Sequence, residues 1–220
     1  MSPLLALALL GALAAASCPP DGPITVDTHA VGCADLRLTV AADNVTLVIE
    51  GATGSINVTS NAAGTTLRLL DSTVDGNVTL GGPHAFADVR RSTVTGADVV
   101  VLSGARNATI TVVDSTLTGA VVASVLSSAV GASVLSSAVG VSLTISNSTL
   151  SATRYAASVV GATIRDVAIA VTDSRLTLAG ADNVGVVALA AATVFNAAVN
   201  VTASSVTCKA GSYVGVLGAG

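Results

Sequence analysis

Short segments with alternating apolar residues recur along the chain, and each one ends in a similar polar pentad. The pentads are centred on serines that follow one another at intervals of 20, 23, 33, 26 and 30 residues. They read LDSTV at 70–74, RRSTV at 90–94, VDSTL at 113–117, SNSTL at 146–150, TDSRL at 172–176 and TASSV at 202–206. Alternation with a period of two predicts a strand with one buried face, and the Asp-Ser or Asn-Ser that follows predicts a tight turn.

The apolar positions have a fixed place relative to each central serine. The residues five before, three before and two after the serine are Val, Ile or Leu in seventeen of eighteen cases, and Ala87 is the exception. A repeat of this length cannot bury its own apolar edge, but stacked repeats share one continuous core. We therefore expect an all-β fold, a right-handed parallel β-helix (solenoid) of about six irregular coils of 20–30 residues.

The expected domain organisation follows from where these repeats begin. We assign 1–17 to a signal peptide, 18–66 to an amino-terminal cap with the first coils, and 67–220 to the β-helix repeats. Within the repeats, the segment ASVLSSAVG at 123–131 recurs unchanged at 132–140. Nine is an odd number, so an insertion inside a strand would turn every later side chain to the wrong face. The duplicated segment 123–140 is therefore expected to form a loop.

The same region supports a rival interpretation as a membrane span. No charged residue occurs between Ser115 and Thr153, and 121–141 is rich in Val, Ala and Leu, although paired serines interrupt it. A second uncharged stretch at 184–201 contains Asn196 and a glycosylation signal at Asn200. An integral membrane protein with a span near 121–141 thus remains an alternative.

Composition narrows the class of protein further. Hydrophobic residues make up 51% of the chain, charged residues 10%, and the net charge is −4. Disordered chains have low hydrophobicity and high charge, and nucleic-acid-binding surfaces need an excess of Lys and Arg. We expect a folded chain with a sizeable core and no nucleic-acid partner.

The first residues predict entry into the secretory pathway. An apolar run from Leu4 to Ala16 is too short to span a membrane, and Ala15 and Ser17 suit a signal-peptidase site. The segment before the run departs from the usual pattern because it lacks Lys and Arg. The expected location is the cell surface or the extracellular space.

Glycosylation signals agree with that compartment. Six of nine asparagines begin an N-x-S/T triplet without proline, which is more than chance predicts. The six candidate N-glycosylation sites are Asn44, Asn57, Asn77, Asn107, Asn147 and Asn200. An alternative is that Asn-Val-Thr is only part of the strand repeat, and the two interpretations are compatible.

Three cysteines are present, and two of them lie close together in the sequence. Cys18 and Cys33 are fifteen residues apart. In an oxidising compartment they are the natural disulfide pair, which would stabilise the fold by roughly 3 kcal/mol. Cys208 is left over, which indicates an external partner or a missing part of the same protein, with a buried structural thiol as the alternative.

Catalytic chemistry is sparsely represented. Asp71, Asp114 and Asp173 occupy equivalent positions in their repeats, where a row of carboxylates could bind calcium or serve a polysaccharide lyase or hydrolase, but other residues interrupt the row. His29 and His84 match no metal or triad spacing. We assign no catalytic, cofactor-binding or metal-binding residue, and keep the polysaccharide-active enzyme as the alternative.

Two phrases and the repeated D-S-T-L units resemble a known family. They are MSPLLALALLGALAAASCPPDGPITVD at the start and VVLSGARNATITVVDSTLTGA at 100–120. They are similar to the amino-terminal part of the dispersed gene family surface proteins of trypanosomes. The resemblance implies a very large surface glycoprotein with a β-helix-like ectodomain, carboxy-terminal membrane spans and adhesion to host molecules, with no catalytic residues to carry over.

The resemblance also sets expectations about partners. The chain stops at Gly220 without the spans, so it is expected to be a fragment or truncated copy, with membrane anchoring only through a carboxy-terminal region that it lacks. An uncapped coil leaves an open strand edge, so we expect self-association. The expected function is structural or adhesive, with host or extracellular-matrix macromolecules as partners and no cofactor.

Overall fold

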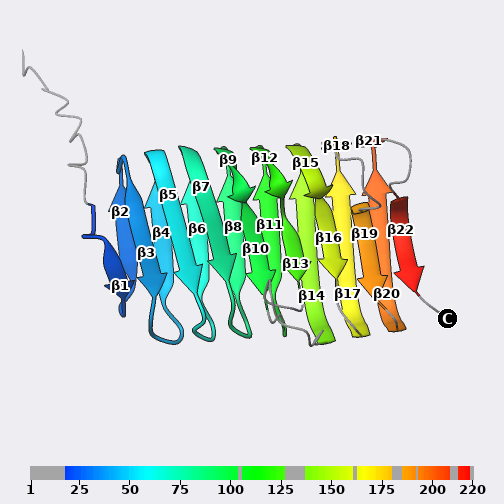
Figure 1. Ribbon diagram of the computed structural model, residues 1–220, viewed down its shortest axis with the longest axis horizontal. Helices are drawn as coiled ribbons and strands as arrows, with labels where there is room; N and C mark the ends of the chain where they lie inside the picture. The colour runs from blue at the N-terminus through cyan, green and yellow to red at the C-terminus, as the bar shows by residue number, and fades with distance from the viewer. Residues whose placement is uncertain are drawn as a thin grey trace, which may run out of the picture.

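The chain folds into a long stack of parallel strands (Figure 1). The computed structural model describes residues 18–103, 106–126, 137–160, 163–179, 185–191, 193–208 and 213–218. Every element in these ranges is a strand, and successive coils lie side by side from the amino-terminal to the carboxy-terminal end. Two sheets run the length of the stack, which confirms the expected all-β parallel solenoid.

The smaller sheet, sheet A, takes one strand from each coil. Its eight strands pair in parallel in the order β2-β4-β6-β8-β11-β14-β17-β20. Their bounds are β2 Thr28–Val31, β4 Thr46–Glu50, β6 Thr66–Leu70, β8 Phe86–Arg90, β11 Thr109–Val113, β14 Ser137–Ser146, β17 Thr163–Thr172 and β20 Thr193–Thr202.

The larger sheet, sheet B, divides partway along the stack. Its first strands are β1 Gly22–Ile24, β3 Leu36–Val40, β5 Thr53–Ser60 and β7 Thr73–Leu80. Strand β7 pairs with both β9 and β10, so each later coil contributes two strands in place of one. One branch is β9 Thr93–Asp98, β12 Thr116–Val121, β15 Thr149–Tyr155, β18 Arg175–Leu178 and β21 Ser205–Cys208. The other is β10 Val100–Ser103, β13 Ser124–Leu126, β16 Ala157–Val160, β19 Gly185–Ala191 and β22 Tyr213–Gly218.

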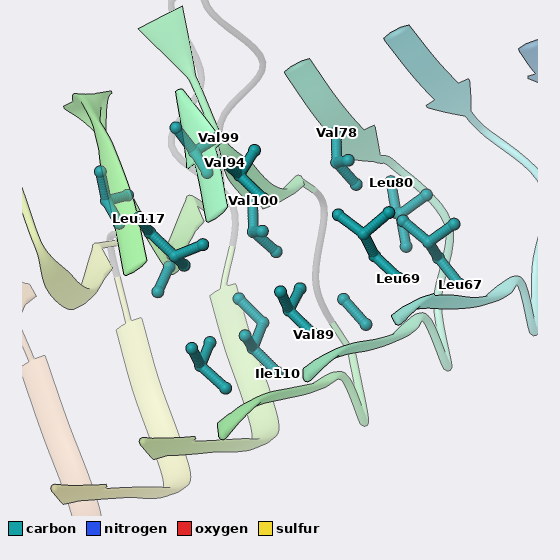
Figure 2. Packing of buried hydrophobic residues seen from close by; sticks show 14 of the residues in the cluster. Leu67, Leu69, Val78, Leu80, Val89, Val94, Val99, Val100, Ile110 and Leu117 are labelled. Atoms are coloured by element: carbon teal, nitrogen blue, oxygen red, sulfur yellow. The ribbon is translucent and has the colours of Figure 1, made fainter. Parts of the chain in front are cut away.

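Equivalent apolar residues of successive coils stack into rows inside the solenoid (Figure 2). Ile110 pairs with Leu143 and Leu143 pairs with Ile169 in sheet A, and none of the three is more than 1% exposed. The other inward positions predicted from the pentads are buried through the coil that ends at Leu176. Each buried aliphatic side chain contributes about 1.5–3 kcal/mol, so the rows supply the main driving force for folding.

Sheet A has two more coils than the six that the pentads predict. Strands β2 and β4 end at corners where Gly32-Cys33 and Gly51-Ala52 stand in place of the polar residue and serine. Glycine adopts the same backbone conformation as the aspartates that follow later strands, so the geometry is kept although the sequence signature is lost. The stacking therefore extends through 18–66.

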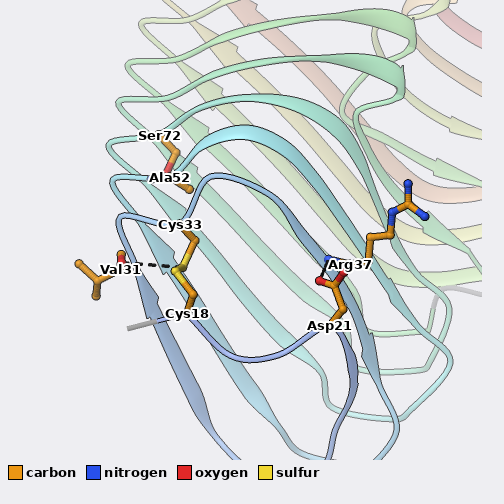
Figure 3. The surroundings of a disulfide bond; sticks show 7 residues. All are labelled: Cys18, Asp21, Val31, Cys33, Arg37, Ala52 and Ser72. Carbon is orange, nitrogen blue, oxygen red and sulfur yellow. Dashed lines mark hydrogen bonds between the residues drawn. A yellow bond between two sulfur atoms is a disulfide. The ribbon is translucent and has the colours of Figure 1, made fainter. Parts of the chain in front are cut away.

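Aspartates of the first coils hold the coil that follows. Asp21, Asp27, Asp35 and Asp43 each accept a hydrogen bond at Oδ1 from a backbone N–H of the next coil, at 2.7–2.8 Å. Figure 3 shows one of these contacts, between Asp21 and the backbone of Arg37. These carboxylates satisfy backbone donors near the ends of strands in the first coils.

The duplicated segment is not a loop throughout. Its first part contains β13 and its last part begins β14, whereas residues 127–136 lie outside the described residues. Both described ends pair in register with neighbouring coils, which the expectation of a loop over 123–140 missed. The two copies thus contribute different halves of one coil.

The two segments considered as membrane spans are strands where they are described. Val121 ends β12, β13 and β14 follow, and the second candidate, 184–201, contains β19 and most of β20. No helix in the described ranges is long and apolar enough to cross a membrane.

Inward positions become less covered in the last coil. Val201 is 37% exposed and Val199 and Val206 are half-buried, although their counterparts one coil earlier are fully buried. Phe195, on the outer side of the same coil, is 49% exposed. The centroid of its ring is 5.3 Å from Cζ of the Arg165 guanidinium.

A charge inside the stack is predicted to prevent folding, whereas a charge one residue away on the outer side is tolerated. Ile145→Asp places a carboxylate at a position with no exposure, which costs several kcal/mol against a total stability of about 5–15 kcal/mol. Thr144→Asp is the matched control, because Thr144 is half-buried on the outer side. Circular dichroism with urea unfolding measures both, and equal damage would contradict the register.

Removing one copy of the nine-residue segment is predicted to leave the fold and its stability unchanged. Three successive coils have an equivalent connection from sheet B to sheet A, because Ser103, Leu126 and Val160 align at its start and Arg106, Val139 and Arg165 align at its end. The two ends differ in residue number by three, thirteen and five in these coils. Deletion shortens the middle connection to four residues, which lies between its two neighbours. A urea midpoint within error of the native chain is expected, and loss of cooperative unfolding would show that the inserted residues are structural.

Candidate functional site: the two corners of the coil

One corner of every coil is made by a residue in the left-handed conformation. It lies where sheet A ends and sheet B begins, and its residues are Gly32, Gly51, Asp71, Arg91, Asp114, Asn147, Asp173 and Ala203, with φ of 46–65°. Asp and Asn tolerate this conformation better than other residues with a Cβ, which explains their frequency before the pentad serine. We call this column corner 1.

The serines that follow corner 1 form a buried hydrogen-bonded ladder. Each Oγ donates to the carbonyl two residues earlier and accepts the backbone N–H of the equivalent residue in the preceding coil. For Ser115 these bonds are 2.7 Å to Val113 O and 3.2 Å from Ser92 N. The serine ladder consists of Ser72, Ser92, Ser115, Ser148, Ser174 and Ser204. A buried hydroxyl needs such partners, so serine here is structural.

The exposed side chains of corner 1 interact along the column. Arg91 donates to both carboxylate oxygens of Asp71 at 2.6 Å, and Asn147 Nδ2 donates to Asp114 Oδ1 at 2.7 Å. The hydrogen bond from Arg91 lowers the pKa of Asp71, and the same bond raises the pKa of Arg91. The predicted carboxylate row therefore exists as a column, but a guanidinium and an amide stand between its members.

In the described residues, no two carboxylates are neighbours along corner 1. Three shallow depressions in the described surface each contain one carboxylate, from Asp173, Asp166 or Asp27, and the depression with Asp27 also contains His29. Glycosidic bond cleavage by the usual mechanism needs two facing carboxyl groups. Within the described residues, no three His, Cys, Asp or Glu side chains are grouped so as to hold a metal ion.

Each coil from the second onward has another left-handed residue, which lies either just before its sheet A strand or in the first half of that strand. Its column, corner 2, consists of Asn44, Gly64, His84, Asn107, Gly140, Asp166 and Asn196. The Oδ1 atoms of Asn44 and Asn107 lie over Gly64 and Gly140 of the following coils, where any Cβ would collide with them. Glycine at these two positions makes room for the asparagine amide of the coil before.

The six asparagines of the glycosylation signals lie on the outer surface, in three settings. Asn44 and Asn107 are exposed in corner 2, and Asn147 is exposed in corner 1. Asn200 is exposed on the outer side of β20. Asn57 and Asn77 are half-buried neighbours on the outer side of sheet B.

Both histidines are exposed side chains. His29 is exposed on β2, with Nε2 at 3.1 Å from Glu50 Oε2. His84 is an exposed corner 2 residue. Both positions are on the surface, as a histidine outside any motif leads one to expect.

Cys18 and Cys33 form the predicted disulfide bond (Figure 3). Their Cα atoms are 5.6 Å apart, which is within the usual range for a disulfide. Cys33 takes the place of the serine in the first coil, so the bond fastens the start of the chain to corner 1. The side chain of Cys208 lies outside the described residues, and its partner stays a prediction.

Sequence reasoning located corner 1 but missed corner 2 and the role of the serine hydroxyl. Corner 2 could have been predicted from its spacing, since Asn44, Gly64 and His84 follow one another at intervals of 20 residues. Three different residue types at one position do not form a visible motif. The serine was interpreted only as turn chemistry, and its bond to the preceding coil requires knowledge of the stacking.

Loss of one ladder hydroxyl is predicted to destabilise the whole stack. Ser115→Ala leaves the buried Ser92 N–H without its acceptor, which costs about 1–3 kcal/mol. Ser146→Ala is the matched control, because Ser146 is half-buried on the outer side and its loss should cost less than about 0.5 kcal/mol. Urea unfolding compares the two, and equal midpoints would show that the ladder bond adds nothing.

Comparisons with known proteins add no assignment to this geometry. No protein-family model, no curated protein and no solved structure matches the chain. The solenoid fold is therefore established by strand pairing alone, and the resemblance to the dispersed gene family surface proteins stays a prediction.

Proposed function

We propose that the chain is a secreted or cell-surface glycoprotein with a structural and adhesive role and no catalysis. Its partners in this proposal are host or extracellular-matrix macromolecules. The resemblance to trypanosome surface proteins is part of the same proposal. The observation that carries it is a regular hydroxyl-bearing column on the outside of sheet B.

This column, the threonine face, repeats one residue type at one strand spacing. Thr53, Thr73, Thr93, Thr116 and Thr149 pair in register from coil to coil, and all five are exposed. Neighbouring members are about 4.8 Å apart because they belong to adjacent strands. A β-branched side chain has few rotamers, so the hydroxyl groups are held in place before any partner binds.

The polar groups of corner 1 support an absence of catalysis. The Asp71 carboxylate is engaged by Arg91 and the Asp114 carboxylate by the Asn147 amide. A general acid needs a raised pKa, whereas the pKa of Asp71 is lowered by its partner. These carboxylates are placed to hold neighbouring coils together.

The disulfide and the surface asparagines support the compartment. Disulfide bonds persist in oxidising environments, and the Cys18–Cys33 bond closes the first coil. All six sequon asparagines are on outward-facing positions, where attached sugars would not enter the core. A rigid, sugar-bearing stack is suited to holding a contact surface away from its point of attachment.

The proposal predicts that binding to matrix components depends on the threonine face. The secreted chain is tested against immobilised collagen, laminin, fibronectin and heparan sulfate by surface plasmon resonance. We expect binding to at least one, and at least a tenfold loss for Thr116→Glu, because a charge interrupts the neutral column. Thr172→Glu is the control, since Thr172 is exposed on the outer side of sheet A.

Two outcomes would contradict this function. Failure to bind any of the four components, or an equal loss with both variants, would remove the adhesive role of the face. Release of unsaturated products from a polyuronate in the presence of calcium, dependent on Asp114 or Asp173, would make the chain an enzyme.

A further inference from the structure

The six sequon asparagines fall into two groups that differ in exposure and in the contacts of their side-chain amides. Four are exposed, at corner positions or on the open outer side of β20, and two are stacked on each other in sheet B. N-linked sugar is attached to the side-chain nitrogen, so the surroundings of Nδ2 decide whether a folded coil accommodates it.

The four exposed asparagines are not stacked on another sequon asparagine. Asn44 and Asn107 turn Oδ1 toward the glycine of the next coil. Asn200 accepts a hydrogen bond at Oδ1 from Thr202 Oγ1 at 3.1 Å, which leaves its nitrogen uncommitted to that contact. Asn147 Nδ2 donates to Asp114 Oδ1, but Asn147 is exposed and its corner 1 neighbours, Asp114 and Asp173, are not sequon asparagines.

The two stacked asparagines use their amides to join adjacent coils. Asn57 Oδ1 accepts both the backbone N–H and the Nδ2 of Asn77 at 3.3 Å, and Asn57 Nδ2 donates to Ser55 Oγ at 3.3 Å. Both side chains are half-buried. We call this arrangement the asparagine ladder.

Spacing adds a steric limit to this engagement. Asn57 and Asn77 pair directly across β5 and β7, so their Cα atoms are about 4.8 Å apart. A pyranose ring with its hydroxyl groups is wider than one strand spacing. Sugars on both neighbours at once would collide with each other, whereas exclusion of sugar from either one alone rests on the half-burial of the two amides and on their hydrogen bonds.

We propose that N-linked sugar is attached at Asn44, Asn107, Asn147 and Asn200, and that the asparagine ladder excludes it from Asn57 and Asn77. This inference rests on the proposed function as a glycoprotein. Strands β5 and β7 also carry Thr53 and Thr73 of the threonine face. An unmodified ladder keeps the first part of that face free of sugar, so glycan placement and adhesion are linked.

The test compares two variants that both destroy the sequon at Asn57. Thr59→Val removes the hydroxyl that the transferase requires and keeps the Asn57 amide, whereas Asn57→Ala removes the amide itself. Both chains, with the native one, are secreted from a eukaryotic host, and glycopeptide mass spectrometry measures occupancy at every site. We expect Asn77 to stay unmodified in the native chain and in Thr59→Val, and to carry sugar in a measurable fraction of the Asn57→Ala chains.

The possible failures are distinguishable. Sugar at none of the six asparagines would contradict the glycoprotein function itself. Sugar at Asn57 and Asn77 of the native chain, beside sugar at the other four, would overturn only the ladder inference. Asn77 remaining unmodified in Asn57→Ala would show that the ladder is not what excludes it. Absence of sugar from Asn44 or Asn107 would overturn the assignment of the corner sites.

Discussion

The bond from one corner serine to the next fixes the register on which the solenoid depends. Every coil has a left-handed residue at corner 1, and from the third coil onward a serine follows it whose Oγ accepts the N–H of the coil before, as Ser115 Oγ accepts Ser92 N–H. A shift of one residue would break this bond and turn the aliphatic rows outward at the same time. Polar and apolar constraints therefore select the same alignment, although the coils differ in length from 20 to 33 residues.

Coils differ in length outside sheet A and corner 1, so the alignment of these two parts is kept. Sheet A keeps its register from β4 to β20. Sheet B divides after β7, so the longer coils gain a second strand without changing the corner. The first coils use aspartate side chains to accept hydrogen bonds from backbone N–H groups of the next coil. The stack thus accommodates irregular repeats around one invariant corner.

Much of the fold could be predicted from the sequence because the strongest constraints leave a local signature. Alternating aliphatic residues before a polar residue and serine located the inner rows, and Ile110, Leu143 and Ile169 do stack. The first two coils lacked the signature, since glycine satisfies the same φ without a recognisable pentad. Corner 2 was hidden for a related reason, because Asn, Gly, His and Asp all occur there.

The candidate site was less predictable than the fold. The sequons identified six asparagines, but only strand pairing reveals that Asn57 and Asn77 are neighbours with shared hydrogen bonds. In the same way, the row of aspartates was visible, whereas the ion pair of Asp71 with Arg91 and the hydrogen bond of Asp114 with Asn147 depend on contacts between residues 20 and 33 positions apart. Side-chain pairing across coils is a property of the stack and not of any one repeat.

The orientation of the ladder bonds has a mechanical consequence. Bonds such as Ser174 N to Ser204 Oγ run along the long axis, so tension applied between the two ends pulls directly on the contacts between coils. Under such a load the coils would detach singly, beginning at an end, and a coil of twenty residues would release about 70 Å of extended chain. A tether built this way yields in steps and absorbs force before its last coil opens.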